Sequence, residues 1–236
     1  MDAPASKRGP RRVPEGVKRP MLTSVELLND VEESQVVAAF LVAELHSPRY
    51  RATVLSLLRQ AGTTTRLIEA PRLDHASENA LRARILGAYR GWPDRFLFHR
   101  FPGVVRWRRG VLTKADLGAV LYINDNPRLP GHEGWSEVSW FDLAAGTRLV
   151  ADGAKTVQRG RPKPGYEPVF ANILATADKV RAGTQYPELI LARHSATSPL
   201  LIVEGHTRAT AYVIAGRESV PVFIGEAPGL NGWHLS

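Results

Sequence analysis

Apolar residues recur at helical spacing in the first half of the chain and gather into short runs in the second half. One helix is expected to begin at Ser34, because five apolar residues that follow it share one face: Val36, Val37, Phe40, Leu41 and Leu45. Two further helices are expected before Gly91, which is a typical helix C-terminal residue. Residues 34–91 are therefore predicted to form a compact three-helix unit.

The second half of the chain alternates between strand-like and helical patterns. Strands are expected at residues 104–111, 136–143, 189–192, 200–203 and 220–224. A capping box, Thr113 to Asp116, should open a short helix, and residues 169–182 should form a longer one. The pattern predicts an α+β fold in three parts. These are a basic arm (1–20), a helical unit (21–92) and a small mixed-sheet domain (93–236, with its core at 135–225).

One strand passes directly into a helix near the C-terminus. The apolar run 200–203 ends at Glu204 and Gly205, and a helical pattern begins at once with His206, Thr207 and Arg208. The first N–H groups of a helix have no partner within the helix, and the helix dipole makes their position attractive to an anion. Glycine allows a ligand to approach the backbone closely. The turn is therefore a candidate phosphate site.

This strand, acidic-Gly-x-x-Arg turn and helix resemble the ParB/sulfiredoxin superfamily, over roughly the last 100 residues of the chain. In that family the turn, here Glu204 to Arg208, lies against nucleotide phosphates. Members include CTP-binding partition proteins, sulfiredoxins, free-serine kinases that use ATP or ADP, and proteins described as nucleases. Sulfiredoxins need a cysteine directly after the turn glycine. This chain has His206 there and no cysteine anywhere, which excludes sulfiredoxin chemistry.

The resemblance implies a nucleotide-binding protein that holds ATP, ADP or CTP with Mg²⁺. A phosphotransferase or nucleotide hydrolase acting on a small-molecule acceptor is the expected activity. The alternatives are a nucleotide-regulated module that binds DNA or protein without catalysis, and a ParB-like nuclease. Gly205, His206, Thr207 and Arg208 are the expected phosphate contacts, with the His206 ring favoured in its neutral form.

The resemblance also directs attention to the loop that follows the first strand of the domain. Arg148 lies there and is a candidate phosphate clamp, or else a surface arginine in a turn. The family's serine kinases carry a glutamate in this loop as general base, but no glutamate occurs between Ala144 and Thr156. Asp142, Asp152 and Glu204 are the remaining candidates for a catalytic acid or base. For Asp142 a solvent-facing position on a strand is the favoured interpretation, and for Glu204 helix capping is an equal alternative.

The composition of the chain indicates which partners and which cellular compartment to expect. Residues 1–20 hold six basic residues against two acidic ones, and so carry half of the net charge of +8. This arm is rich in Pro and Gly and lacks periodicity, so we expect it to be disordered, either as a solubilising tail or as a nonspecific contact to nucleic acid. No apolar stretch is long enough to span a bilayer, and no zinc signature is present. The absence of cysteine is typical of a reducing compartment, so a cytoplasmic location is expected.

A second basic run interleaves an aromatic residue with cations. Arg106, Trp107, Arg108 and Arg109 follow one another in a predicted strand. An exposed tryptophan between arginines would stack on a nucleic-acid base. The strand pattern favours a simpler interpretation, in which one tryptophan is buried and the arginines are solvated.

Overall fold

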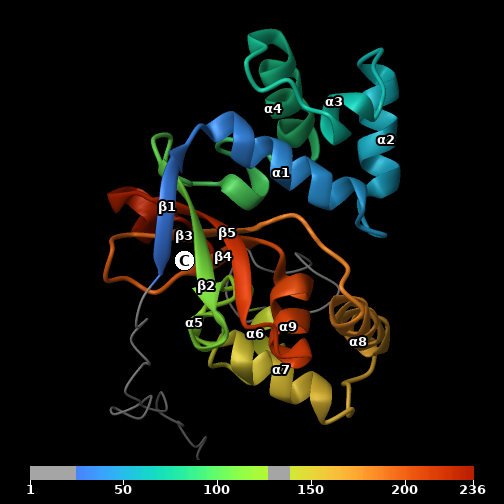
Figure 1. Ribbon diagram of the computed structural model, residues 1–236, viewed down its shortest axis with the longest axis vertical. Coiled ribbons are helices and arrows are strands. Elements are labelled where there is room, and N and C mark those ends of the chain that lie inside the picture. The colour runs from blue at the N-terminus through green and yellow to red at the C-terminus, as the bar shows by residue number, and fades with distance from the viewer. Residues whose placement is uncertain (1–24, 127–138) are drawn as a thin grey trace, which may run out of the picture.

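A computed structural model describes residues 25–126 and 139–236. Its centre is a five-stranded mixed sheet with the order β1-β2-β5-β3-β4 (Figure 1). The strands are β1 (Glu26–Val31), β2 (Arg106–Thr113), β3 (Leu189–Arg193), β4 (Leu201–Glu204) and β5 (Ser219–Glu226). β3 and β5 are parallel, and the other neighbouring pairs are antiparallel. The expected α+β class is confirmed.

The four helices of the N-terminal part cover one face of the sheet (Figure 1). They are α1 (Glu33–Leu45), α2 (Arg51–Gln60), α3 (Arg66–Glu69) and α4 (Ala76–Arg90). The helix α4 ends as expected at Gly91, which has a positive φ of 81°. A single-turn 3₁₀ helix at Phe96–Phe98 then leads to β2.

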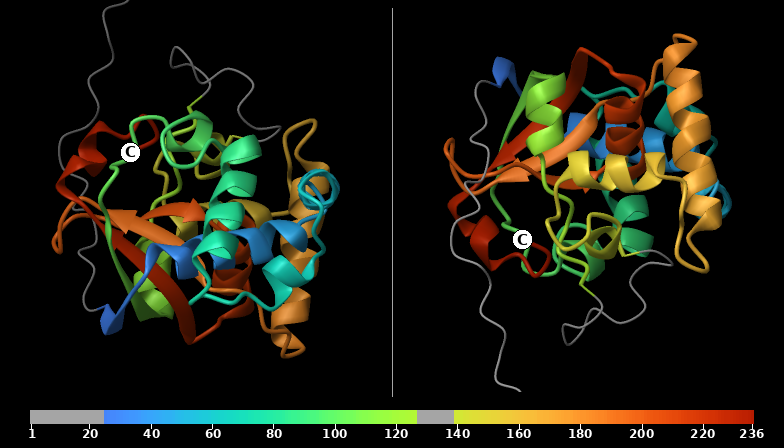
Figure 2. Two further views of the ribbon diagram at one scale, coloured as in Figure 1. Left: turned by 90° about the horizontal axis from the view of Figure 1, so that it is seen from above. Right: turned by 90° about the horizontal axis from the view of Figure 1, so that it is seen from below.

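The later helices cover the opposite face, as the two views of Figure 2 show. They are α5 (Lys114–Ala119), α6 (Trp140–Leu143), α7 (Val150–Gln158), α8 (Glu167–Arg181) and α9 (His206–Ala215), and a 3₁₀ turn, Pro228–Gly232, follows β5. The predicted cap of α5 is confirmed, because the Thr113 side chain accepts a hydrogen bond from the Asp116 N–H. The protein is thus a helix, sheet and helix sandwich.

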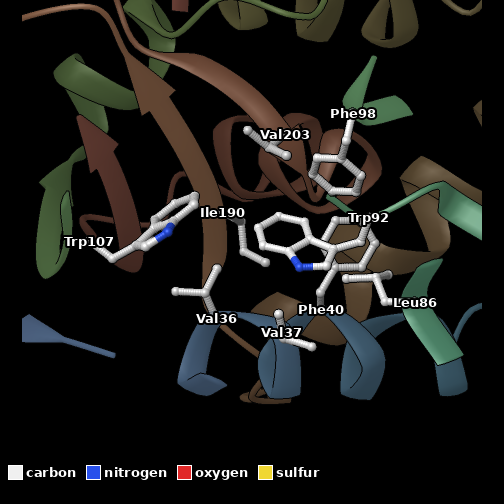
Figure 3. A pocket seen from close by; sticks show the side chains of 9 residues that line it. All are labelled: Val36, Val37, Phe40, Leu86, Trp92, Phe98, Trp107, Ile190 and Val203. Atoms are coloured by element: carbon white, nitrogen blue, oxygen red, sulfur yellow. The ribbon is translucent and has the colours of Figure 1, made fainter. Parts of the chain in front are cut away.

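The alternation of side chains along the strands explains the two cores. On β3, Ile190 and Ala192 belong to the core beneath α1–α4, whereas Leu189 and Leu191 belong to the core beneath α5, α7, α8 and α9. Figure 3 shows the first core, where side chains of α1 and α4 meet Trp107, Ile190 and Val203 of the strands. The helical part therefore shares a hydrophobic core with the sheet.

The helices α3 and α7 were not among the expected elements, so the expected three-helix unit contains four helices. Two further elements contradict the sequence-based expectation. The first is β1, which lies inside the stretch 21–92 that was expected to be helical, and which pairs with β2. Four of its six residues are exposed, so this edge strand lacks the apolar alternation that would have revealed it.

The second difference concerns the expected strand at 136–143. Its described part is the short helix α6, and Ser139 caps this helix by accepting a hydrogen bond from the Asp142 N–H at 3.1 Å. The Asp125 carboxylate accepts two more, from the N–H groups of Trp140 and Phe141, both at 2.8 Å. These capping contacts satisfy the free N–H groups of a helix start, which a strand would not present.

Several expectations fall outside the described residues. The basic arm at 1–20 lies there entirely, as do positions 136–138 of the expected strand. Among the helices that the structure describes, none is both long enough and apolar enough to cross a membrane.

Candidate functional site

The predicted strand, turn and helix are confirmed at the centre of the molecule. β4 ends at Glu204, Gly205 occupies the N-cap position with φ 105° and ψ 23°, and α9 begins at His206. The N-cap glycine has no side chain that could cap the helix, and the first turn contains no acidic residue. The first N–H groups of a helix have no partner within the helix, so the start of α9 is a candidate for binding an external acceptor.

The backbone of the turn requires a glycine at position 205, independently of any ligand. A left-handed backbone conformation at φ 105° strains any residue with a Cβ. A Cβ at this position would also lie 2.5 Å from Cδ2 of Leu189. The glycine thus lets the chain reverse tightly against β3, in addition to leaving the helix N-terminus open.

Arg208 does not present its guanidinium as a free phosphate contact. Its Nη1 donates to the backbone carbonyls of Pro187 and Glu188, and its Nη2 forms an ion pair with Glu204 one turn earlier. The residue is 8% exposed. Arg208 therefore links the turn to the segment before β3, and Glu204 forms the ion pair with its guanidinium.

The His206 ring is held by aromatic neighbours. It stacks on Trp140, with ring centroids 5.1 Å apart, and on Tyr122, with centroids 6.0 Å apart. Tyr122 is anchored in turn by a 2.6 Å hydrogen bond between its Oη and Oγ1 of Thr210. Thr210 also donates to the His206 carbonyl, so its hydroxyl makes a hydrogen bond within α9.

Burial is the main reason why the pKa of His206 is unusually low. Desolvation, together with the positive charges of Arg90 and Arg208, lowers the pKa of His206 to about 3. The ring is therefore neutral at physiological pH, as expected. Its Nε2 is buried and has no hydrogen-bond partner among the described residues.

The other candidate residues are engaged elsewhere. Arg148, at φ 65°, donates from Nε to the Tyr122 carbonyl and from Nη2 to the Leu235 carbonyl, so it fastens two backbone segments. Asp142 lies in α6, 3.3 Å from Nζ of Lys163.

Asp152 lies in the first turn of α7. It accepts hydrogen bonds from Thr147 and Lys155 at 2.8 and 2.9 Å. The Lys155 contact is the main cause that lowers the Asp152 pKa. The described contacts therefore do not gather Asp142, Asp152 and Glu204 into one acid–base centre.

A buried ion pair lies in the helical layer on the other face of the sheet. Glu44 of α1 accepts a 2.9 Å hydrogen bond from Nε of Arg90, which also donates from Nη1 to the Tyr50 hydroxyl at 2.9 Å. The Arg90 guanidinium lies 3.8 Å from the centroid of the Tyr50 ring. The charge of Arg90 lowers the pKa of His206, and the charge of Glu204 raises that of Glu44.

Glu44 is 1% exposed, and burial raises its pKa to about 7. The ion pair with Arg90 lowers this pKa, and the nearby charge of Glu204 raises it. A signal for this residue existed in the sequence, because Glu44 continues the helical face of Val37, Phe40 and Leu41. A carboxylate on the apolar stripe of a helix is costly unless it is paired, which makes it a candidate for function.

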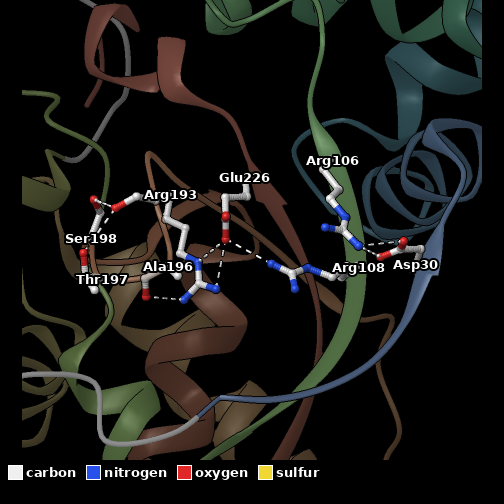
Figure 4. Close-up of polar contacts among 9 residues, drawn as sticks. Asp30, Arg106, Arg108, Arg193, Ala196, Thr197, Ser198 and Glu226 are labelled. Carbon is white, nitrogen blue, oxygen red and sulfur yellow. Dashed lines mark hydrogen bonds and ion pairs between the residues drawn. The ribbon is translucent and has the colours of Figure 1, made fainter.

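Each arginine of the basic run on β2 has an acidic partner, which for Arg109 is Glu188. Figure 4 shows Arg108 and Arg193 converging on Glu226, with nitrogen–oxygen distances of 3.0 and 3.1 Å, while Arg106 pairs with Asp30. Trp107 is 3% exposed and packs in the core. The simpler interpretation of this run is thus confirmed for the tryptophan, which has no free face for a base.

No group of three or more histidine, aspartate and glutamate side chains in residues 25–126 and 139–236 converges as a metal site would require. Comparison of the chain with protein-family models, with curated proteins and with solved structures found no match.

Proposed function

We propose that the protein binds a phosphate-bearing ligand, a nucleotide, at the N-terminus of α9. The observation that carries this proposal is the start of that helix, which has a glycine at the N-cap and no acidic residue in its first turn. Such a helix start supplies several N–H donors and a positive potential to one acceptor. Two guanidinium groups, of Arg90 and Arg208, add to this potential at His206.

The individual roles differ from those inferred from the turn sequence. The backbone N–H groups of the first turn and the half-buried Thr207 hydroxyl are the direct phosphate contacts. Arg208 positions the turn through its bonds to Glu204 and the Pro187 carbonyl. The neutral His206 ring, which stacks on Trp140, forms one side of the proposed binding site.

Binding is the part of the function that the geometry supports best. The resemblance to the ParB/sulfiredoxin superfamily indicates ATP, ADP or CTP with Mg²⁺, and transfer of a phosphoryl group to a small-molecule acceptor, or hydrolysis, as the activity. Phosphoryl transfer depends mainly on positioning and charge stabilisation. The N-terminus of α9 would supply both through its N–H groups and its dipole.

Replacing Thr207 by glutamate is expected to abolish ligand binding without harming the fold. A carboxylate in the first turn interacts favourably with the helix dipole, by about 0.3–1 kcal/mol, so the melting temperature should stay constant or rise. The same carboxylate repels a phosphate at that position. Thermal-shift measurements with ATP, ADP, CTP and GTP, with and without Mg²⁺, would show a stabilising shift for the wild type only; a ligand at about 100 times its Kd contributes roughly 2.7 kcal/mol.

Thr207→Gln is the matched control, since it has the same length as Thr207→Glu but no charge. It should retain most of the nucleotide shift. Equal nucleotide-induced shifts in melting temperature for the Glu and Gln variants would contradict phosphate binding at the N-terminus of α9. The absence of any shift in the wild type would refute nucleotide binding altogether.

A further inference from the structure

A polar cleft opens in the helical layer, between the loop that follows α2, the helix α3 and the first turn of α4 (Figure 1). Its volume is about 260 Å³. One molecule of liquid water takes up about 30 Å³, so the cleft has room for roughly eight or nine waters or for a small organic molecule. The polar residues of its lining are Thr63, Thr64, Arg66, Arg72 and Glu78.

A buried arginine of α4 holds the walls of this cleft in place. Arg82 is fully buried, and it donates from Nη1 to the Leu67 carbonyl and from Nη2 to the Arg72 carbonyl, both at 3.0 Å. Its Nη1 also lies 3.7 Å from Oε2 of Glu78. Leu67, Arg72 and Glu78 all line the cleft, so one guanidinium fixes three parts of the lining. A lining that is ordered before binding loses little conformational entropy when a ligand binds.

The lining carries an excess of positive charge. The Glu78 carboxylate accepts a 2.9 Å hydrogen bond from Nε of Arg72 and also faces Arg82, so two cations already compensate its charge. Arg66 is exposed, and it has no ion pair or hydrogen bond with another residue in the described parts of the chain. Its guanidinium therefore remains available in a concave and otherwise neutralised surface.

We propose that this cleft binds a small organic anion, whose carboxylate or phosphate group is held by Arg66. A guanidinium presents parallel N–H donors that match the oxygens of both groups. The hydroxyls of Thr63 and Thr64 are further donors in the same lining. A cationic ligand is disfavoured because Glu78 is already paired twice. The cleft shares no residue with the α9 turn, so this inference does not depend on the proposed nucleotide site.

Calorimetric titration of the whole chain with citrate and with inorganic phosphate tests the cleft, at a constant ionic strength set with potassium chloride. At least one probe should bind the wild type, and the tighter one identifies the preferred group. Arg66→Gln removes the guanidinium but keeps a good helix former, so this variant should melt like the wild type. Its affinity for the anion should fall about tenfold or more, as expected for the loss of a charged hydrogen bond.

Two further variants show where the anion binds. Arg59→Gln is the matched control, because Arg59 is an exposed arginine of the neighbouring helix α2 that does not line the cleft. It removes the same charge and should keep the affinity of the wild type. Thr207→Glu, which is designed to block the start of α9, should also leave the anion in the cleft unaffected.

The remaining outcomes would overturn the proposal. Failure of both probes to bind would do so, as would an affinity that Arg66→Gln leaves unchanged. Equal losses in Arg59→Gln and Arg66→Gln would show attraction to the overall charge of the protein instead of a site. Phosphate binding that Thr207→Glu abolishes and Arg66→Gln does not would place the anion at α9, which contradicts the cleft but leaves the proposed function intact.

Discussion

Arg208→Ala is expected to destabilise the protein strongly. The substitution leaves the Glu204 carboxylate without its cation, and it removes donors from the carbonyls of Pro187 and Glu188. Breaking a buried pair by removing one partner costs about 3–5 kcal/mol. For a domain of this size the melting temperature falls by roughly 2–4 °C per kcal/mol, so a loss on the order of 10 °C is expected.

Arg181→Ala is the matched control for this measurement. Arg181 also makes an ion pair and a carbonyl contact, with Asp178 and Ile214, but its side chain is 50% exposed. Exposed pairs contribute about 0–1 kcal/mol, so its melting temperature should change little. The opposite pattern, in which Arg208→Ala melts like the wild type but loses nucleotide binding, would restore Arg208 as a direct phosphate contact.

Glu44 and His206 are expected to give the protein opposite responses to acidification. Burial raises the pKa of Glu44 from 4.5 to about 7, so the folded state binds more protons than the unfolded state between these values. Stability from this group therefore increases as the pH falls through 7. Burial lowers the pKa of His206 from 6.5 to about 3, so its contribution is lost as the pH falls below 6.5.

The two effects largely cancel in the wild type and separate in single variants. Denaturant unfolding at pH 7.5 and pH 5 should show His206→Gln gaining about 2 kcal/mol of stability on acidification relative to the wild type. Glu44→Gln should lose about 2–3 kcal/mol relative to the wild type over the same interval. Titrations of other groups are common to all three proteins and cancel in the differences.

Parallel pH profiles for the three proteins would show that neither group titrates abnormally. NMR titration of the His206 imidazole provides a second, direct measurement that does not depend on the stability of either variant. A ring that gains a proton near pH 6.5 would contradict the buried, neutral histidine.

The predicted and observed elements agree best where the sequence pattern is local. The run 200–203, the glycine at 205 and the helical spacing after it led directly to β4, the turn and α9, because a strand end, a positive-φ glycine and a helix start are all specified within a few residues. The α5 cap was found for the same reason. The strand expected at 136–143 was wrong where it is described, because the contacts from Asp125 that start α6 come from another segment.

The candidate site shows the same division. The sequence by itself determined the strand end, the glycine turn and the helix start, since these follow from residues 200–208 and their immediate chemistry. The neutral state of His206 was expected from the sequence, but its causes, which are burial and the charges of Arg90 and Arg208, come from the tertiary structure. Only the tertiary structure decided that Arg208 supports the turn, and that the Trp140 and Tyr122 rings stack on His206 from segments far from it in the chain. Burial, ion pairing and unpaired polar atoms depend on which distant segments the two cores bring together, and no local pattern encodes that choice.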